Sequence, residues 1–295
     1  MLLPTLALIF LWLQLFWSLV PTWLNGQYYE YGWFVPILAA ALAASRLGGW
    51  TAGKIDRDSP VLKSRVSPWI VGIMLFVILL IAWLRMISIA DPSWRPPLIL
   101  HALIVASCTH FWVGSTLGWK ISTSLLPVTL FTLSSVPLPY QAEQWLIGNL
   151  ASIVANFTHE LLILQGYPVD LKGITLYHGA QMVEVSEGCS GIRSFQSLLM
   201  VALFFGELLL LPWFRRLILI ANAAIFAFGV NMIRAYILSI LHFSHGSEFA
   251  NRQHDSIGNY AFVTSSILLF ITAKFLLPAS KTNRILVAKS TSKTP

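Results

Sequence analysis

The sequence is poor in charged residues. Of its 295 residues, 11% are charged and 56% are hydrophobic, whereas a soluble domain carries about 25% charged residues. Such a chain cannot cover a globular surface with solvated charges, which excludes a soluble globular protein. The mean hydropathy of +0.72 and the 12 Trp and 18 Phe residues predict an all-α protein with several transmembrane helices in a lipid bilayer.

Cysteine is scarce as well. Cys108 lies within an apolar stretch, where a free thiol serves as a small core residue, and the second cysteine is Cys189. Two cysteines are too few for a disulfide framework. The sequence also lacks an HExxH or CxxC motif, and its seven histidines are scattered. Neither a metal nor another cofactor is therefore expected.

Acidic residues are fewer than basic ones, 12 against 19, which gives a net charge of +7. The basic residues do not form a contiguous stripe with interleaved aromatic rings, so no nucleic-acid partner is expected. They concentrate in a few loops and in the C-terminal tail, which the positive-inside rule assigns to the cytoplasm. The most basic loop contains Arg46, Lys54, Arg57, Lys63 and Arg65, and the tail contains Lys281, Arg284, Lys289 and Lys293.

Hydrophobic stretches predict about eight membrane crossings. The first has neither a preceding basic segment nor a small-residue cleavage site, so we expect a transmembrane helix and not a signal peptide. With the basic segments inside, both termini are cytoplasmic in a multi-pass protein of the plasma membrane. The stretches are residues 3–24, 32–44, 69–89, 98–118, 121–136, 192–211, 217–241 and 259–277.

The region between the fifth and sixth stretches differs in character. Residues 141–164 include Glu143, Asn149 and Asn156, which predicts an interfacial or partly buried helix and not a lipid-exposed span. Residues 166–188 are predicted to be an extracytoplasmic loop. Alternating side chains in 174–179 and 181–185 predict a short β-hairpin within it.

Cys189 stands immediately before a predicted helix, in Glu184-Val-Ser-Glu-Gly-Cys189-Ser-Gly-Ile-Arg193-Ser. A helix N-terminus and a nearby cation favour the thiolate, which is the nucleophilic form of cysteine. Ser190 and Gly191 are suited to a tight turn before the helix. Arg193 lies one helical turn on, where it either helps to hold the thiolate or only fixes the helix end. Without its neighbours, Cys189 would be interpreted as a structural cysteine.

Two further candidates lie at the edges of membrane-length stretches. Arg234 is an ionisable residue within a span, which is costly and usually functional, although a snorkelling interfacial arginine has the same pattern. Asn231 shares a helix face with Arg234, where it can orient the guanidinium or bind a substrate carbonyl. His254 is the candidate proton carrier, with His242 and His245 as rivals. The predicted topology brings Cys189, Arg234 and His254 to the outer face.

At these positions the chain resembles the exosortase/archaeosortase family of membrane cysteine transpeptidases. Cys189-Ser-Gly-Ile-Arg193-Ser is similar to the family signature Cys-Ser-Gly-(Leu/Ile)-Arg-Ser. Asn231-Met-Ile-Arg234 is similar to its Asn-x-x-Arg, and His254-Asp-Ser-Ile-Gly258 to its His-x-x-x-Gly. The resemblance favours His254 over its rivals and covers about residues 122–277. It implies three parts: N-terminal helices (1–118), a catalytic core (119–278) and a basic tail (279–295).

The resemblance implies an enzyme that sorts exported proteins. Its substrate would be a membrane protein whose C-terminus carries a short motif such as Pro-Glu-Pro, a transmembrane helix and a basic cluster. Cleavage near the motif at the outer face would pass the acyl group to an acceptor. Cys189 would be the nucleophile, Arg234 the oxyanion partner and His254 the proton carrier, with Ser190, Gly191, Arg193 and Asn231 in supporting positions.

Two other classes stay open from the residues. A serine-type intramembrane hydrolase would use Ser186, Ser190 or Ser194. A transporter or channel would line a pathway with Arg234, Glu207 and histidines, although we find no paired half-repeats of the kind common in transporters. Glu184, Glu187 and His178 receive no role.

Overall fold

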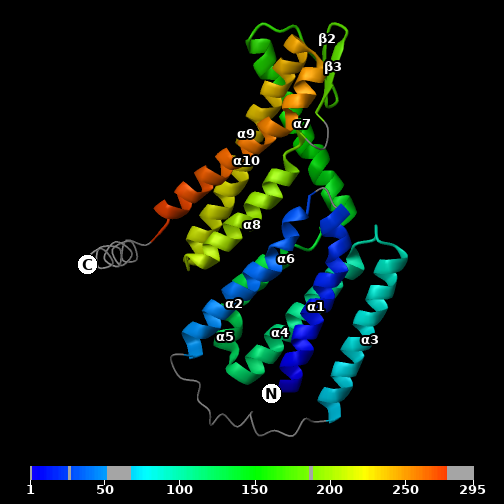
Figure 1. The fold of residues 1–295 in the computed structure, drawn as a ribbon, viewed down its shortest axis with the longest axis vertical. Coiled ribbons are helices and arrows are strands. Elements are labelled where there is room, and N and C mark those ends of the chain that lie inside the picture. The colour runs from blue at the N-terminus through cyan, green and yellow to red at the C-terminus, as the bar shows by residue number, and fades with distance from the viewer. Residues whose placement is uncertain (1, 26–27, 52–67, 186–188, 278–295) are drawn as a thin grey trace, which may run out of the picture. The chain divides into compact units, whose positions relative to one another are not determined.

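A computed structural model describes residues 2–25, 28–51, 68–185 and 189–277 (Figure 1). The described chain is mostly helical, with one small antiparallel sheet. It forms two compact units, residues 1–143 and 144–295. The basic tail, most of the basic loop, Ser186 and Glu187 lie outside the described residues, and the three-part division predicted above stays a prediction.

In the first unit, α4 packs against α1, α3 and α5, and α2 packs against α6. Gly118, with φ of 99°, makes the turn from α4 to α5, a conformation that suits glycine. The elements are α1 (Leu2–Asn25), η1 (Glu30–Trp33), α2 (Val35–Thr51), α3 (Pro68–Ala90), α4 (Pro96–Leu117), α5 (Trp119–Ser124) and α6 (Leu126–Leu133).

The predicted span 121–136 is a correction, because two short helices, α5 and α6, replace it. Pro127 near the start of α6 lacks a backbone N–H, which favours a break in the helix there. His110 of α4 contacts both short helices: Nδ1 lies 3.0 Å from the Ser122 hydroxyl of α5, and Nε2 lies 2.9 Å from the Thr129 hydroxyl of α6. The break is thus tied to α4 by side-chain hydrogen bonds.

A buried ion pair anchors the other end of this unit. Arg95 Nη1 lies 2.8 Å from Glu143 Oε1 and donates to the Leu138 carbonyl at 3.0 Å. The Tyr29 hydroxyl donates to Glu143 Oε2 at 2.7 Å and accepts the Leu138 N–H at 3.0 Å. Burial raises the pKa of Tyr29 far above its usual range, so the phenol stays a donor to the carboxylate. Both carboxylate oxygens of Glu143 are satisfied.

The second unit contains α9 packed against α8 and α10, together with the sheet in the order β1-β2-β3. One apolar core joins α7, the sheet and α9 around Leu162, Leu176 and Ala235. Another joins α8, α9 and α10 around Leu198, Leu219 and Leu269. The elements are α7 (Tyr140–Leu164), β1 (Asp170–Lys172), β2 (Thr175–His178), β3 (Gln181–Glu184), α8 (Ile192–Leu208), α9 (Trp213–His245) and α10 (Ser247–Phe275).

The predicted hairpin is present as β2 and β3, which pair from Thr175–Glu184 to His178–Gln181. Gly179 has φ of 60° and makes the turn, as glycine does where the backbone enters the left-handed region. The third strand, β1, was not predicted. Asp170 pairs with Tyr177 across it, so the loop carries a sheet and not a lone hairpin.

Five described helices are long and apolar enough to cross a membrane: residues 4–25, 96–117, 140–164, 213–245 and 247–275. Shorter apolar helices cover 35–48 and 75–90, and α8 has 17 residues. The protein is therefore a multi-pass membrane protein, whereas the predicted eight crossings are not confirmed.

The helix α7, which was predicted to be interfacial or partly buried, is one of the five candidate spans, and 39% of its apolar stretch is buried. Two of its polar side chains turn back onto their own helix. Asn149 Nδ2 donates to the Trp145 carbonyl at 2.7 Å, and Asn156 Nδ2 donates to the Ser152 carbonyl at 2.8 Å. A satisfied amide costs far less in an apolar environment than an unsatisfied one, so these two asparagines are compatible with a partly buried membrane span.

Candidate active site

The turn before α8 presents Cys189. Gly191 caps the helix with φ of 82°, in the left-handed region that side chains rarely adopt. A Cβ on Gly191 would lie 2.8 Å from Cγ of Asn231, so glycine is required for close approach as well as for conformation. Ser190 is fully buried, and its Oγ lies 3.4 Å from the Ile192 N–H at the helix start. Cys189 itself is half-buried.

Asn231 holds this turn against α9. Its Nδ2 donates to the Cys189 carbonyl at 2.8 Å, and its side chain is 2% exposed. Its Oδ1 lies 3.5 Å from Nη1 of Arg234, three residues along the helix. The amide thus positions the cysteine backbone first and the guanidinium second. The sequence predicted only the second of these contacts.

Arg234 meets His254 across the α9–α10 contact. Arg234 Nη2 lies 3.0 Å from His254 Nε2. A guanidinium only donates hydrogen bonds, so Nε2 accepts and the imidazole proton is on Nδ1. That proton faces Asp255 Oδ1 at 3.1 Å. The contacts therefore select the neutral tautomer whose lone pair lies on Nε2.

The same nitrogen faces the thiol. Cys189 Sγ lies 3.9 Å from His254 Nε2, within reach of a weak sulfur hydrogen bond. Thiol and guanidinium therefore address one acceptor atom from two neighbouring segments. Three elements meet here: the turn before α8, α9 and α10.

His254 precedes the predicted last span, residues 259–277, and lies within the helix that contains most of this span. The helix α10 begins at Ser247, so the imidazole projects from a rigid element. One turn further on, a Cβ on Gly258 would lie 3.4 Å from Arg234 Nη2. Glycine here leaves room for the guanidinium beside the imidazole.

The rival histidines lie elsewhere. The His242 ring contacts Phe243, and the His245 ring contacts Phe249. Neither forms a hydrogen bond with Cys189 within the described part of the chain. His178, which had no predicted role, donates from Nδ1 to the Pro168 carbonyl at 2.9 Å, and its ring lies 5.2 Å from that of Phe243 in a tilted arrangement, so it connects the sheet to α9.

The remaining predicted residues occupy the margins of this cluster. Arg193 is exposed in the first turn of α8, and Glu184 is exposed at the end of β3. Asp255 was missed by the sequence argument. Its side chain is 97% exposed, and the only available signal was its place directly after His254.

The arrangement has the parts of a nucleophilic site. A half-exposed thiol has a neutral imidazole acceptor within reach, and a guanidinium lies beside that acceptor, where it can stabilise negative charge. Nucleophile, base and a third orienting group in mutual contact are typical of acyl-transfer enzymes.

Comparison with known proteins bears on the whole chain. No curated protein matches it, and no solved structure does. The family described as "Transmembrane exosortase (Exosortase_EpsH)" matches residues 23–271, a range that includes every candidate site residue. This chain belongs to the transmembrane exosortase family.

Proposed function

We propose that this exosortase is a cysteine transpeptidase that cleaves the C-terminal sorting signals of exported membrane proteins. The observation that carries the proposal is the convergence of Cys189 Sγ and Arg234 Nη2 on His254 Nε2, at 3.9 and 3.0 Å. A structural cysteine needs no such acceptor, and a surface arginine needs no such neighbour.

The first step is proton transfer from the Cys189 thiol to His254 Nε2. The lone pair of Nε2 is the site that Arg234 Nη2 also addresses. Once Nε2 carries the proton it can no longer accept, so the guanidinium N–H is released as the imidazolium forms. The new thiolate faces the imidazolium that has formed, which stabilises it.

The thiolate attacks the scissile carbonyl carbon, and the carbonyl oxygen becomes an oxyanion. The released Arg234 guanidinium binds that oxyanion, and a donor so placed is worth about 10²–10³ in rate. His254 then gives its proton to the leaving amine as the C–N bond breaks. Cys189 holds the N-terminal portion of the substrate as a thioester.

An acceptor amine, or water, resolves the thioester. His254 takes a proton from the attacking group, the new bond to the acyl carbon forms, and the C–S bond breaks. Asp255 holds the Nδ1 proton through both halves of the cycle. The substrate is a protein with a short C-terminal motif such as Pro-Glu-Pro followed by a membrane helix and basic residues, cleaved at the outer face of the plasma membrane.

The test is co-expression with a reporter that ends in such a signal, followed by the intact mass of the reporter. Wild-type enzyme and Cys108→Ala should trim it, and any added mass identifies the acceptor. Cys189→Ala should leave it whole while the enzyme remains in the membrane. Trimming by Cys189→Ala would refute the proposal.

A serine nucleophile gains no support from the described residues. Ser190 is fully buried at the start of α8, where its hydroxyl serves the backbone. A Cys189→Ser enzyme should therefore lose most of its activity, whereas full activity would favour a serine hydrolase.

A further inference from the structure

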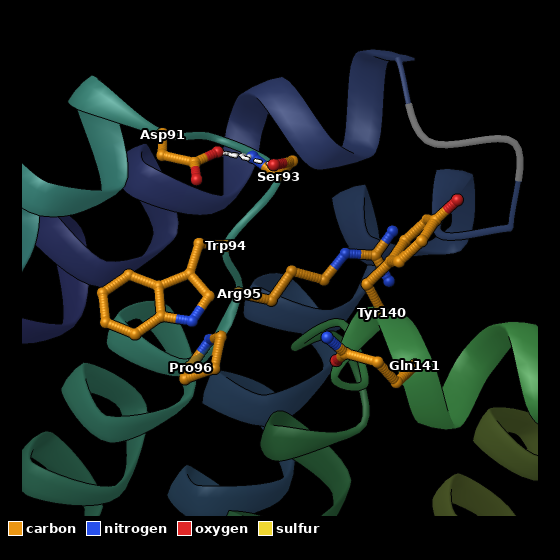
Figure 2. Close-up of a pocket in the computed structure, with 7 residues that line it drawn as sticks. All are labelled: Asp91, Ser93, Trp94, Arg95, Pro96, Tyr140 and Gln141. Carbon is orange, nitrogen blue, oxygen red and sulfur yellow. Dashed lines mark hydrogen bonds between the residues drawn. The ribbon is translucent and has the colours of Figure 1, made fainter.

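A second polar site lies in the first unit, on the turn between α3 and α4. A cavity of about 190 Å³ is lined there by side chains of that turn and of the start of α7 (Figure 2). Liquid water occupies about 30 Å³ per molecule, so the cavity holds a small polar group and not a peptide segment. The lining residues are Asp91, Ser93, Trp94, Arg95, Pro96, Tyr140 and Gln141.

The two ends of the cavity differ in charge. Figure 2 shows Asp91 and Trp94 on one side and Arg95, Tyr140 and Gln141 on the other. Ser93 donates to Asp91 Oδ1 from its N–H at 3.0 Å and from its hydroxyl, and the hydroxyl bond holds the pKa of this carboxyl below its usual range. One end is thus anionic and aromatic, and the other is cationic.

The cationic end is fixed before any ligand arrives. The Arg95 guanidinium is held by the buried Glu143 and by the Leu138 carbonyl, and it lies 5.8 Å from the centre of the Tyr140 ring. Glu143 also offsets its charge. A purely anionic ligand would therefore gain little here and would face the Asp91 carboxylate.

The aromatic side chain at the Asp91 end favours a cation there. Trp94 is 51% exposed, so its indole ring is open to a ligand. An ammonium group over an indole face is attracted by the ring quadrupole, and choline is recognised in this way. An adjacent carboxylate strengthens the attraction.

The site also borders a membrane-length helix, because α4 begins at Pro96 and is a candidate span. Tryptophan and tyrosine favour the interface, where lipid headgroups lie. A ligand that carries both charges, is small and is abundant at that depth satisfies all of these conditions. We propose that this cavity binds the zwitterionic headgroup of a phospholipid, with the ammonium at Asp91 and Trp94 and the phosphate at Arg95 and Gln141.

The test uses the purified full-length protein in detergent with equal amounts of phosphatidylethanolamine, phosphatidylcholine and phosphatidylglycerol that carry the same acyl chains. Native mass spectrometry should show the two zwitterionic lipids retained about fivefold over phosphatidylglycerol, the size expected for one exposed charge pair. Equal retention of all three lipids would overturn the proposal.

Asp91→Asn keeps an acceptor for Ser93 and removes the charge, so the preference should fall to near parity. Trp94→Leu should lower retention of both zwitterionic lipids. Glu248→Gln and Trp213→Leu remove an exposed acid and an exposed indole from the second unit and should change nothing. A preference that survives Asp91→Asn, or that the controls abolish equally, would contradict the assignment.

Soluble glycerophosphoethanolamine separates a lipid site from a metabolite site. It should occupy the delipidated protein far more weakly than the intact lipid, because it has no acyl chains to pack against the apolar surface of α4. Equal occupancy would replace the lipid with a soluble ligand. Matching thermal unfolding midpoints for each variant and the wild type show that the cavity, and not the fold, was altered.

Discussion

Among the described arginines, two arrangements can be compared. Arg95 and Arg216 each face a carboxylate that is almost fully buried, Glu143 at 2.8 Å and Glu207 at 2.7 Å. Each also donates to a main-chain carbonyl. Arg234, by contrast, meets an imidazole and an amide beside a thiol. The first kind holds helices together, and the second kind has a neighbour whose protonation can change.

Replacing an arginine that pairs with a buried carboxylate should have the largest effect, a loss of stability. Arg216→Met removes the guanidinium that faces the Glu207 carboxylate, which is 1% exposed, and breaking such a buried pair costs about 3–5 kcal/mol of stability. Thermal unfolding in detergent measures the loss. Replacing both residues, Glu207→Leu with Arg216→Met, should restore most of the stability, and a double variant as unstable as the single one would show that the pair is not the cause.

Changing Arg234 should instead cost activity. Arg234→Gln should lower reporter trimming about 10²–10³-fold, because an oxyanion donor is lost, with little change in unfolding temperature. Alkylation of Cys189 by iodoacetamide should fall far less than trimming, since His254 Nε2 remains open to the thiol. A parallel loss of labelling and trimming would mean that Arg234 serves the thiol and not the oxyanion.

Gly191→Ala should have an intermediate effect on both properties. The left-handed conformation costs a side chain about 1–2 kcal/mol, and the new Cβ would press on Asn231 at 2.8 Å, which displaces the Cys189 turn. Gly173→Ala is the matched control, because Gly173 has φ of 64° and open space around it. Equal loss of trimming in both variants would show that the close contact between Gly191 and Asn231 is not needed for activity.

Asp255→Asn should have the smallest effect, a decrease in trimming of about two- to fivefold that shrinks as salt is added. The side chain is 97% exposed, and asparagine retains an acceptor for the Nδ1 proton. Trimming rates at low and high ionic strength make the comparison. A loss as large as that of Arg234→Gln would show that the carboxylate does more than orient the ring.

The sequence predicted the parts of this molecule that depend on local pattern. Apolar stretches located most helices, and alternation with Gly179 located the β2–β3 hairpin. His254 precedes the predicted span 259–277, but the helix itself begins earlier, at Ser247. The first turns of α10 are polar, so the hydrophobic pattern does not include them. The helix α9 has 33 residues and is about 50 Å long, whereas the hydrocarbon core is about 30 Å thick. The turns of a helix that extend beyond the bilayer need not be hydrophobic, so hydropathy does not detect them.

Contacts between distant segments were beyond the sequence. Arg95 and Glu143 are far apart in the chain, and nothing local to either residue indicates the pair. The bond from Asn231 to the Cys189 carbonyl likewise depends on how α8 and α9 pack. The motif located Cys189, Arg234 and His254, and only the packing shows that two of them share one nitrogen of the third.

The most direct test of the account is the intact mass of the enzyme during turnover of a sorting-signal substrate. We predict an adduct equal to the N-terminal portion of the substrate, present in wild type and Cys108→Ala, absent in Cys189→Ala and removed by hydroxylamine, as a thioester is. The acceptor is omitted in this experiment, so that the acyl-enzyme is resolved slowly. Trimming that proceeds without any adduct on Cys189 under these conditions would contradict the account.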